Sequence, residues 1–157
     1  MRRRSSGVLM HITSLPGKQG IGTFGKSAYD FVDFLEETAQ TYWQILPLTT
    51  TSYGDSPYQS FSAVAGNLNL IDFDLLSNEG LLEKEDYERV NFGENPERID
   101  YALLSETRRP ILEKAVSNTK NNSAILAEIE QFEKENASWL SDYAEYMAIK
   151  ESFGYQS

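Results

Sequence analysis

Six residues near the start of the chain, Gly20-Ile21-Gly22-Thr23-Phe24-Gly25, match the G-x-G-x-x-G pattern of dinucleotide-binding turns. In such turns the first glycine directly follows a strand, so that the pyrophosphate meets the N-terminus of the next helix. Here seven residues separate Ile12, the end of the apolar run, from Gly20. The next apolar segment also ends without an acidic residue to hold a ribose. We therefore expect a loop whose glycines serve positive φ or close packing, and no nucleotide site.

The one histidine, His11, stands where the first apolar run passes into this loop. If the run is a strand of a (β/α) barrel, His11 lies at the end that faces the active site and could contact a substrate. The alternative is a histidine hydrogen-bonded into the loop, because no partner nucleophile stands near it to be activated. The sequence favours the second interpretation and leaves the first open.

A second candidate site is the tyrosine-rich stretch YGDSPYQSFSAVAGN, residues 53–67. Tyrosines spaced among Gly, Asp, Ser and Pro offer apolar planes with polar rims, which suit the faces and hydroxyl edges of a sugar. The alternative is a rigid surface turn whose tyrosines pack on the body of the protein, since Asp-Ser-Pro is ordinary turn chemistry.

The elements around these residues read as a β-loop-α-β unit. The runs of residues 7–12 and 42–48 are predicted strands, because the first is short and apolar and opens into turn residues, and the second is short, aromatic and β-branched. Between them apolar residues recur every three or four positions from Ser27, which is the expected N-cap, with Asp30 as its capping-box partner. Such units have parallel strands, as in a doubly wound sheet or a (β/α) barrel.

Beyond the second strand we expect an ordered loop to residue 66, a short extended segment over 68–73, and then helices. The helical patterns cover residues 83–89, 101–116, 124–135 and 138–153. Pro110 is expected to kink or restart the second of them, Ser138 to cap the last and Gly154 to end it. One face of that last helix is shared by Leu140, Tyr143, Met147 and Lys150.

Composition excludes several classes of protein. The net charge of −10 lies wholly after residue 70, which argues against a nucleic-acid surface and suggests a near-neutral, loop-rich part followed by an acidic helical part. No apolar run approaches the roughly 18 residues of a membrane span, and no signal peptide is evident. Zero cysteines exclude disulfides and thiolate metal sites and fit a cytoplasmic protein.

Four motifs stand in the order and spacing of one enzyme family. They are S-G-V-L-x-H-x-T-S-L-P-G, G-I-G-x-x-G, Y-W-Q-x-L-P-L and Y-G-D-S-P-Y-Q-S, and W-L-x-D-Y-A follows from Trp139. The chain from about Ser5 onward resembles the N-terminal end of the amylomaltases, the 4-alpha-glucanotransferases of bacteria and plants.

The resemblance implies an α/β fold: the N-terminal part of a (β/α)₈ TIM barrel, with its first two strands in residues 1–74, followed by an acidic helical inserted subdomain in residues 75–157. A complete barrel takes about 250 residues. We therefore expect this chain to be part of a longer enzyme, with the remainder of the parent chain as its partner.

The resemblance also implies the chemistry: retaining transfer of α-1,4-glucan segments through a covalent glycosyl-enzyme, with maltooligosaccharides and glucans as partners and no cofactor or metal. The catalytic carboxylates come from later strands, so none is expected in this chain, and Asp55 lacks a partner. Tyr58 is expected to stack beside the sugar at the cleavage point, Ser56 to line the donor side, and Tyr53 to hold glucan at a second site. The alternative is a self-sufficient, non-catalytic glucan-binding module.

Overall fold

The computed structural model describes residues 4–154, with the side chain of Tyr53 outside the described part. The chain divides into two compact units, Met1–Val116 and Ser117–Ser157. Each unit is described by itself.

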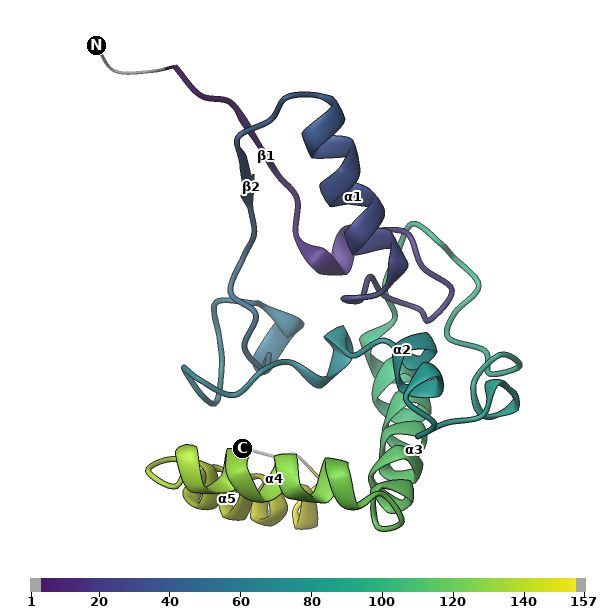
Figure 1. The fold of residues 1–157 in the computed structure, drawn as a ribbon, viewed down its shortest axis with the longest axis vertical. Helices are drawn as coiled ribbons and strands as arrows, with labels where there is room; N and C mark the ends of the chain where they lie inside the picture. The colour runs from purple at the N-terminus through teal and green to yellow at the C-terminus, as the bar shows by residue number, and fades with distance from the viewer. Residues whose placement is uncertain (1–3, 155–157) are drawn as a thin grey trace. The chain divides into compact units, whose positions relative to one another are not determined.

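The first unit opens with the predicted β-loop-α-β arrangement. Strand β1 (Gly7–Leu9) pairs in parallel with β2 (Tyr42–Gln44), in a register that places Val8 opposite Trp43. Helix α1 (Lys26–Glu37) connects them and runs alongside the pair (Figure 1). The regular strands are shorter than predicted, although the Met10 amide continues the ladder by donating to the Gln44 carbonyl at 3.0 Å.

A small core lies between the helix and the strands. Ile12, Leu15, Ala28 and Leu70 are buried together, and Met10, Phe31, Trp43 and Leu48 pack against them. The Phe31 ring meets the Trp43 ring edge-on, with centroids 4.9 Å apart. The Trp43 indole N–H also donates to the Met10 carbonyl at 2.7 Å, which joins the two strands where both end.

The predicted cap of α1 was wrong. Gly25 is the N-cap residue, and the Ser27 hydroxyl instead donates to the Pro16 carbonyl at 2.6 Å. Asp30 makes an exposed ion pair with Lys26 at 2.6 Å rather than closing a capping box. The helix begins earlier than predicted because the glycine loop, and not a side-chain cap, sets its first turn.

The extended segment predicted over residues 68–73 was also wrong. Leu68–Leu70 form a 3₁₀ turn that begins at Asn67, whose side chain accepts from the Asn69 amide at 2.9 Å. Helix α2 (Phe73–Asn78) begins at Asp72, whose carboxylate accepts from the Leu75 amide at 3.1 Å. Two capping side chains therefore started helical turns in a stretch where the apolar alternation pointed to a strand.

Further along, the helix predicted over residues 83–89 is a single 3₁₀ turn, Lys84–Asp86. Helix α3 (Tyr101–Thr119) runs without a restart through Pro110. Pro110 and Glu106, four residues earlier, both face solvent, so water can satisfy the carbonyl that loses its amide partner.

The second unit contains α4 (Ser123–Glu135), capped by Asn122, and α5 (Leu140–Ser152). Trp139 links the two helices: its ring packs edge-on against Phe132, and its N–H donates to the Asn136 side chain at 3.0 Å. Trp139 precedes α5 without a side-chain cap bond, so the predicted Ser138 cap was wrong.

Gly154 ends the second unit's last helix as predicted, with φ of 63° and an amide that donates to the Glu151 carbonyl at 2.8 Å. The predicted shared face is confirmed as half-buried: Leu140, Tyr143, Met147 and Lys150. Across residues 4–154 no helix has both the length and the apolar character that crossing a membrane requires.

Candidate functional site

Two loops leave the sheet at the same end, the carboxyl ends of its strands, because β1 and β2 are parallel. The loop after β1 carries His11 and the glycine motif, and the loop after β2 carries the tyrosine-rich stretch. In parallel α/β proteins the carboxyl ends of the strands are where ligands bind. The two candidates from the sequence, His11 with its loop and the tyrosine-rich stretch, thus follow the same end of the sheet.

His11 joins the exits of the two strands. Its Nδ1 accepts a hydrogen bond from the Leu46 amide at 3.3 Å, so the proton of the neutral ring is on Nε2. Burial lowers the pKa of His11 below its ordinary value, which favours this neutral form. The hydrogen-bonded interpretation is confirmed, although the partner lies after β2 rather than in the loop of His11 itself. A substrate contact by His11 stays a prediction.

The tyrosine-rich loop is closed at its base. Thr49 and Gly66 form an antiparallel bridge, flanked by bonds from the Thr50 amide to the Ala65 carbonyl at 3.2 Å and from the Asn67 amide to the Leu48 carbonyl at 2.9 Å. Nearer the tip, the Ser52 amide donates to the Gln59 carbonyl at 2.9 Å. The backbone of the loop is therefore fixed by its own hydrogen bonds.

The hydroxyls of Ser60 and Ser62 are already used to hold this loop. Ser60 Oγ donates to the Ser62 carbonyl at 2.6 Å and lies 3.1 Å from the Thr50 hydroxyl. Ser62 Oγ accepts from the amides of Val64 and Ala65 at 3.2 and 3.0 Å. These two side chains therefore shape the loop.

Tyr58 is the residue that the loop presents. Its side chain is 72% exposed, while its amide donates to Ser56 Oγ at 3.3 Å. It borders an open hollow of about 360 Å³, whose lining is Pro47, Thr49, Pro57, Tyr58, Ser60, Ser62 and Ala63. An exposed ring on an anchored backbone could serve as a stacking surface, and the surface-turn alternative stays open for Tyr58. The roles of Tyr58 and Ser56 toward sugar stay predictions, and the Tyr53 side chain lies outside the described residues.

Asp55 shares the loop and has a left-handed backbone, with φ of 54°. Burial raises the pKa of its carboxyl. Burial also raises the pKa of Tyr101, and the charge of Asp55 adds to that rise. The sequence did not indicate this electrostatic link, which joins the loop to the start of α3. Within residues 4–154, no group of three or more His, Asp or Glu side chains could hold a metal.

The glycine motif serves packing, as predicted. Gly20 has φ of 78°, a β-carbon on Gly22 would lie 1.9 Å from the Ile12 carbonyl oxygen, and one on Gly25 would lie 2.0 Å from a carboxylate oxygen of Asp72. Each glycine is needed where backbone or a carboxylate comes too close for a side chain.

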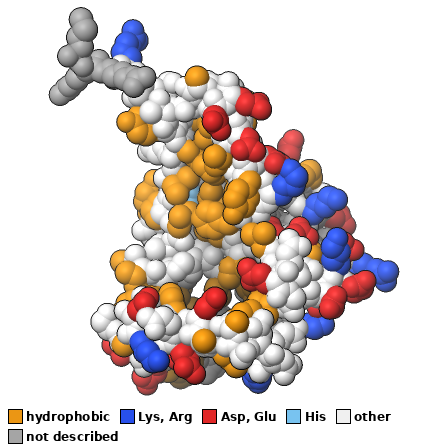
Figure 2. All heavy atoms as spheres, viewed as in Figure 1, with side chains coloured by type: hydrophobic (Ala, Val, Ile, Leu, Met, Phe, Trp, Pro, Cys, Tyr) orange, Lys and Arg blue, Asp and Glu red, His pale blue; other side chains and the backbone are white. Residues whose placement is uncertain are grey.

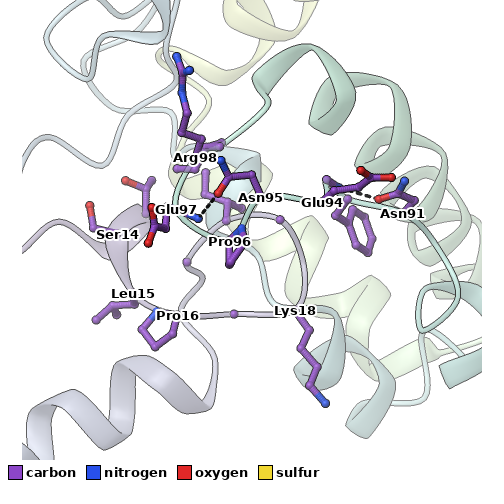
Figure 3. A pocket seen from close by; sticks show the side chains of 18 of the residues that line it. Ser14, Leu15, Pro16, Lys18, Asn91, Glu94, Asn95, Pro96, Glu97 and Arg98 are labelled. Atoms are coloured by element: carbon purple, nitrogen blue, oxygen red, sulfur yellow. Dashed lines mark hydrogen bonds between the residues drawn. The ribbon is translucent and has the colours of Figure 1, made fainter.

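A cavity of about 730 Å³ lies between this loop and the segment 90–99. Figure 3 shows its two basic side chains, Lys18 and Arg98, pointing in opposite directions, while the carboxylate of Glu97 lies near Ser14. The two cations therefore do not converge on one point of this cavity.

A model of the 4-alpha-glucanotransferase family matches residues 10–157. The chain belongs to this family. A 4-alpha-glucanotransferase of Streptococcus pneumoniae is 60% identical over 153 residues, covering 98% of this chain and 30% of its own length. That of Clostridium butyricum is 54% identical over 148 residues, covering 94% of this chain and 30% of its own.

Among solved structures, the amylomaltase of Streptococcus agalactiae in complex with acarbose matches with a TM-score of 0.94 and 62% identity, over 99% of this chain and 31% of that one. The resemblance found in the motifs is thus confirmed. The chain spans about 30% of the length of the relatives it matches.

Proposed function

We propose that this chain is the N-terminal part of a 4-alpha-glucanotransferase, which transfers α-1,4-glucan segments to the 4-hydroxyl of glucose or a maltooligosaccharide. The observation that carries the proposal is the family match over residues 10–157, together with relatives named 4-alpha-glucanotransferase, one of them 60% identical over 153 residues. Because those relatives are enzymes about three times as long, the match favours this assignment over a self-sufficient glucan-binding module.

In this proposal β1 and β2 begin a (β/α)₈ barrel, and residues 75–157 form a helical subdomain inserted into it. The exposed apolar side chains of the first unit support it: Leu9 is 59%, Tyr42 61% and Val32 49% exposed. Figure 2 shows hydrophobic side chains gathered near the lower ends of the two strands. A short parallel pair with such a surface needs further strands and helices to cover it.

The chemistry is retaining transfer, in which one carboxylate attacks the sugar and a second carboxyl group protonates the leaving oxygen. The two carboxyl groups of such enzymes lie about 5 Å apart. Both groups belong to the remainder of the enzyme. The part of this chain is to bind and orient glucan: the Tyr58 ring stacks on the sugar that is transferred, and Ser56 lines the donor side. Tyr53 is assigned to a second glucan contact at the surface.

Two preparations test the proposal. The full-length enzyme, incubated with maltotriose and EDTA, is expected to release glucose and form longer maltooligosaccharides. A chimera with residues 1–157 in place of the matching segment of the Streptococcus pneumoniae enzyme is expected to do the same. The isolated chain is the control and is expected to be inactive. A folded full-length enzyme that makes neither product would overturn the assignment.

A further inference from the structure

A buried polar cluster ties the loop after β1 to helix α3. It consists of Gln19, Thr23, Asp72, Phe73 and Arg108, and we name it the Arg108 cluster. The Arg108 side chain is 1% exposed. Its Nη1 donates to the Gln19 carbonyl at 3.0 Å, its Nη2 donates to the Ile71 carbonyl, and its guanidinium carbon lies 4.2 Å from the centroid of the Phe73 ring.

Asp72 is the second centre of the cluster. Its carboxylate accepts from the Thr23 hydroxyl at 2.6 Å and from the Gln19 side-chain amide at 3.2 Å. The same glutamine accepts from the Phe73 amide through Oε1 at 3.0 Å. Gln19 is thus bound through its backbone and through both ends of its side chain, so the loop is held on several sides at once.

Stability alone is a poor reason for an arginine at this place. Burial lowers the pKa of Arg108 to about 10, with Asp72 opposing the shift, so the side chain still carries its charge at neutral pH. Burying a charge is costly, and apolar residues of similar volume often stabilise a core as well or better. What an apolar side chain cannot do is fix two backbone carbonyls in one fork-shaped geometry.

Arg108 fixes two carbonyls. That of Gln19 lies in the loop after β1, and that of Ile71 lies just before α2. A bond from the Gly22 amide to the Thr13 carbonyl at 3.1 Å closes the loop on itself, and one from the Phe24 amide to the Leu70 carbonyl at 2.9 Å joins it to its surroundings. This loop and the tyrosine-rich loop both leave the sheet at the carboxyl ends of its parallel strands, where α/β proteins bind their ligands, so displacement of the first loop changes that end of the sheet.

We propose that Arg108 is a positioning residue for glucan transfer, which acts by holding the loop of residues 13–25 in place from helix α3. It does not touch the substrate. The inference rests on the proposed function, and small displacements of groups that orient a substrate have large effects on turnover.

The test compares Arg108→Met, Arg108→Lys and the control Ile111→Ala in the full-length enzyme. Ile111 lies one turn further along α3 and is 6% exposed, so its truncation weakens the same helix without removing a donor to the loop. Hydrogen exchange of the backbone amides of residues 13–25 is measured first. We expect faster exchange by about tenfold or more in Arg108→Met, partial recovery in Arg108→Lys, and no local change in Ile111→Ala.

Kinetics with maltotriose follow, at a fixed interval below the Tm of each variant. We expect Arg108→Met to lower kcat about tenfold or more with a smaller change in KM, and Arg108→Lys to recover part of it. If Ile111→Ala lowers kcat equally, or if the loop exchanges normally in both Arg108 variants, the positioning role is refuted.

If Arg108→Met does not fold, Arg108→Lys decides by the same two measurements. A wild-type enzyme without transfer activity refutes the proposed function, whereas the exchange data then still report whether Arg108 holds the loop.

Discussion

Gly22 lies against the backbone carbonyl of Ile12 so closely that a β-carbon would stand 1.9 Å from the oxygen. Gly22→Ala must therefore move backbone in the loop after β1. We expect a loss of about 1–3 kcal/mol in the free energy of unfolding. Chemical denaturation of the full-length enzyme measures it. Gly66→Ala is the matched control, because no heavy atom lies within 4 Å of its β-carbon position. Equal stability of the two variants would contradict this account.

His11 should make stability depend on acid pH. Burial lowers the pKa of His11 from 6.5, and a proton on Nδ1 would break the bond from the Leu46 amide. The unfolded chain then binds this proton more readily than the folded one, so the contribution is complete above pH 6.5 and falls as the pH drops below it. The Tm measured between pH 7.5 and 5 should fall more steeply in the wild type than in His11→Asn. Parallel curves would show that the histidine has no such role.

Tyr58 should matter for turnover more than for folding. Tyr58→Ala in the full-length enzyme removes a stacking surface of about 1 kcal/mol or more, and the loss should grow as the sugar flattens toward its oxocarbenium-like state. We expect a large fall in kcat/KM for Ala, a smaller one for Phe, and little change in Tm if the ring acts on the sugar rather than on packing. A Tyr58→Ala enzyme that melts several degrees lower yet turns over normally would make Tyr58 a packing residue.

Tyr87 should titrate late in alkali. Burial first, and then its hydrogen bond to Asp74 at 2.8 Å, raise the pKa of Tyr87 to about 12 from 10.0. Its contribution to stability is therefore full below pH 10 and is lost as the pH rises from 10 to 12. The difference in phenolate absorbance between the wild type and Tyr87→Phe isolates this group. A midpoint near 10 in that difference curve would contradict the prediction.

The sequence predicted what short-range pattern and turn chemistry control. The βαβ opening, the packing role of the glycine motif and the end of the last helix at Gly154 are all confirmed. The predictions failed where a single side-chain hydrogen bond decides the local structure. Asn67 and Asp72 cap helical turns in a segment that was predicted to be extended.

The Arg108 cluster could not be predicted from the sequence, for a different reason. Its contact from Arg108 to Gln19 spans 89 residues, and an arginine inside a helix pattern gives no sign that it is buried. Likewise, nothing near Tyr101 indicated its electrostatic link to Asp55. The boundary between a barrel part and a helical insertion at residues 74 and 75 stays a prediction, as do the sugar contacts of Tyr53, Ser56 and Tyr58.

The antiparallel bridge between Thr49 and Gly66 closes the tyrosine-rich loop into a unit of its own. The hydrogen bonds at the base of the loop are separate from the pairing of β1 with β2, so we expect changes between these two ends to leave the register of the strands unaltered. The loop can thus diverge in sequence while the strands beneath it keep their pairing.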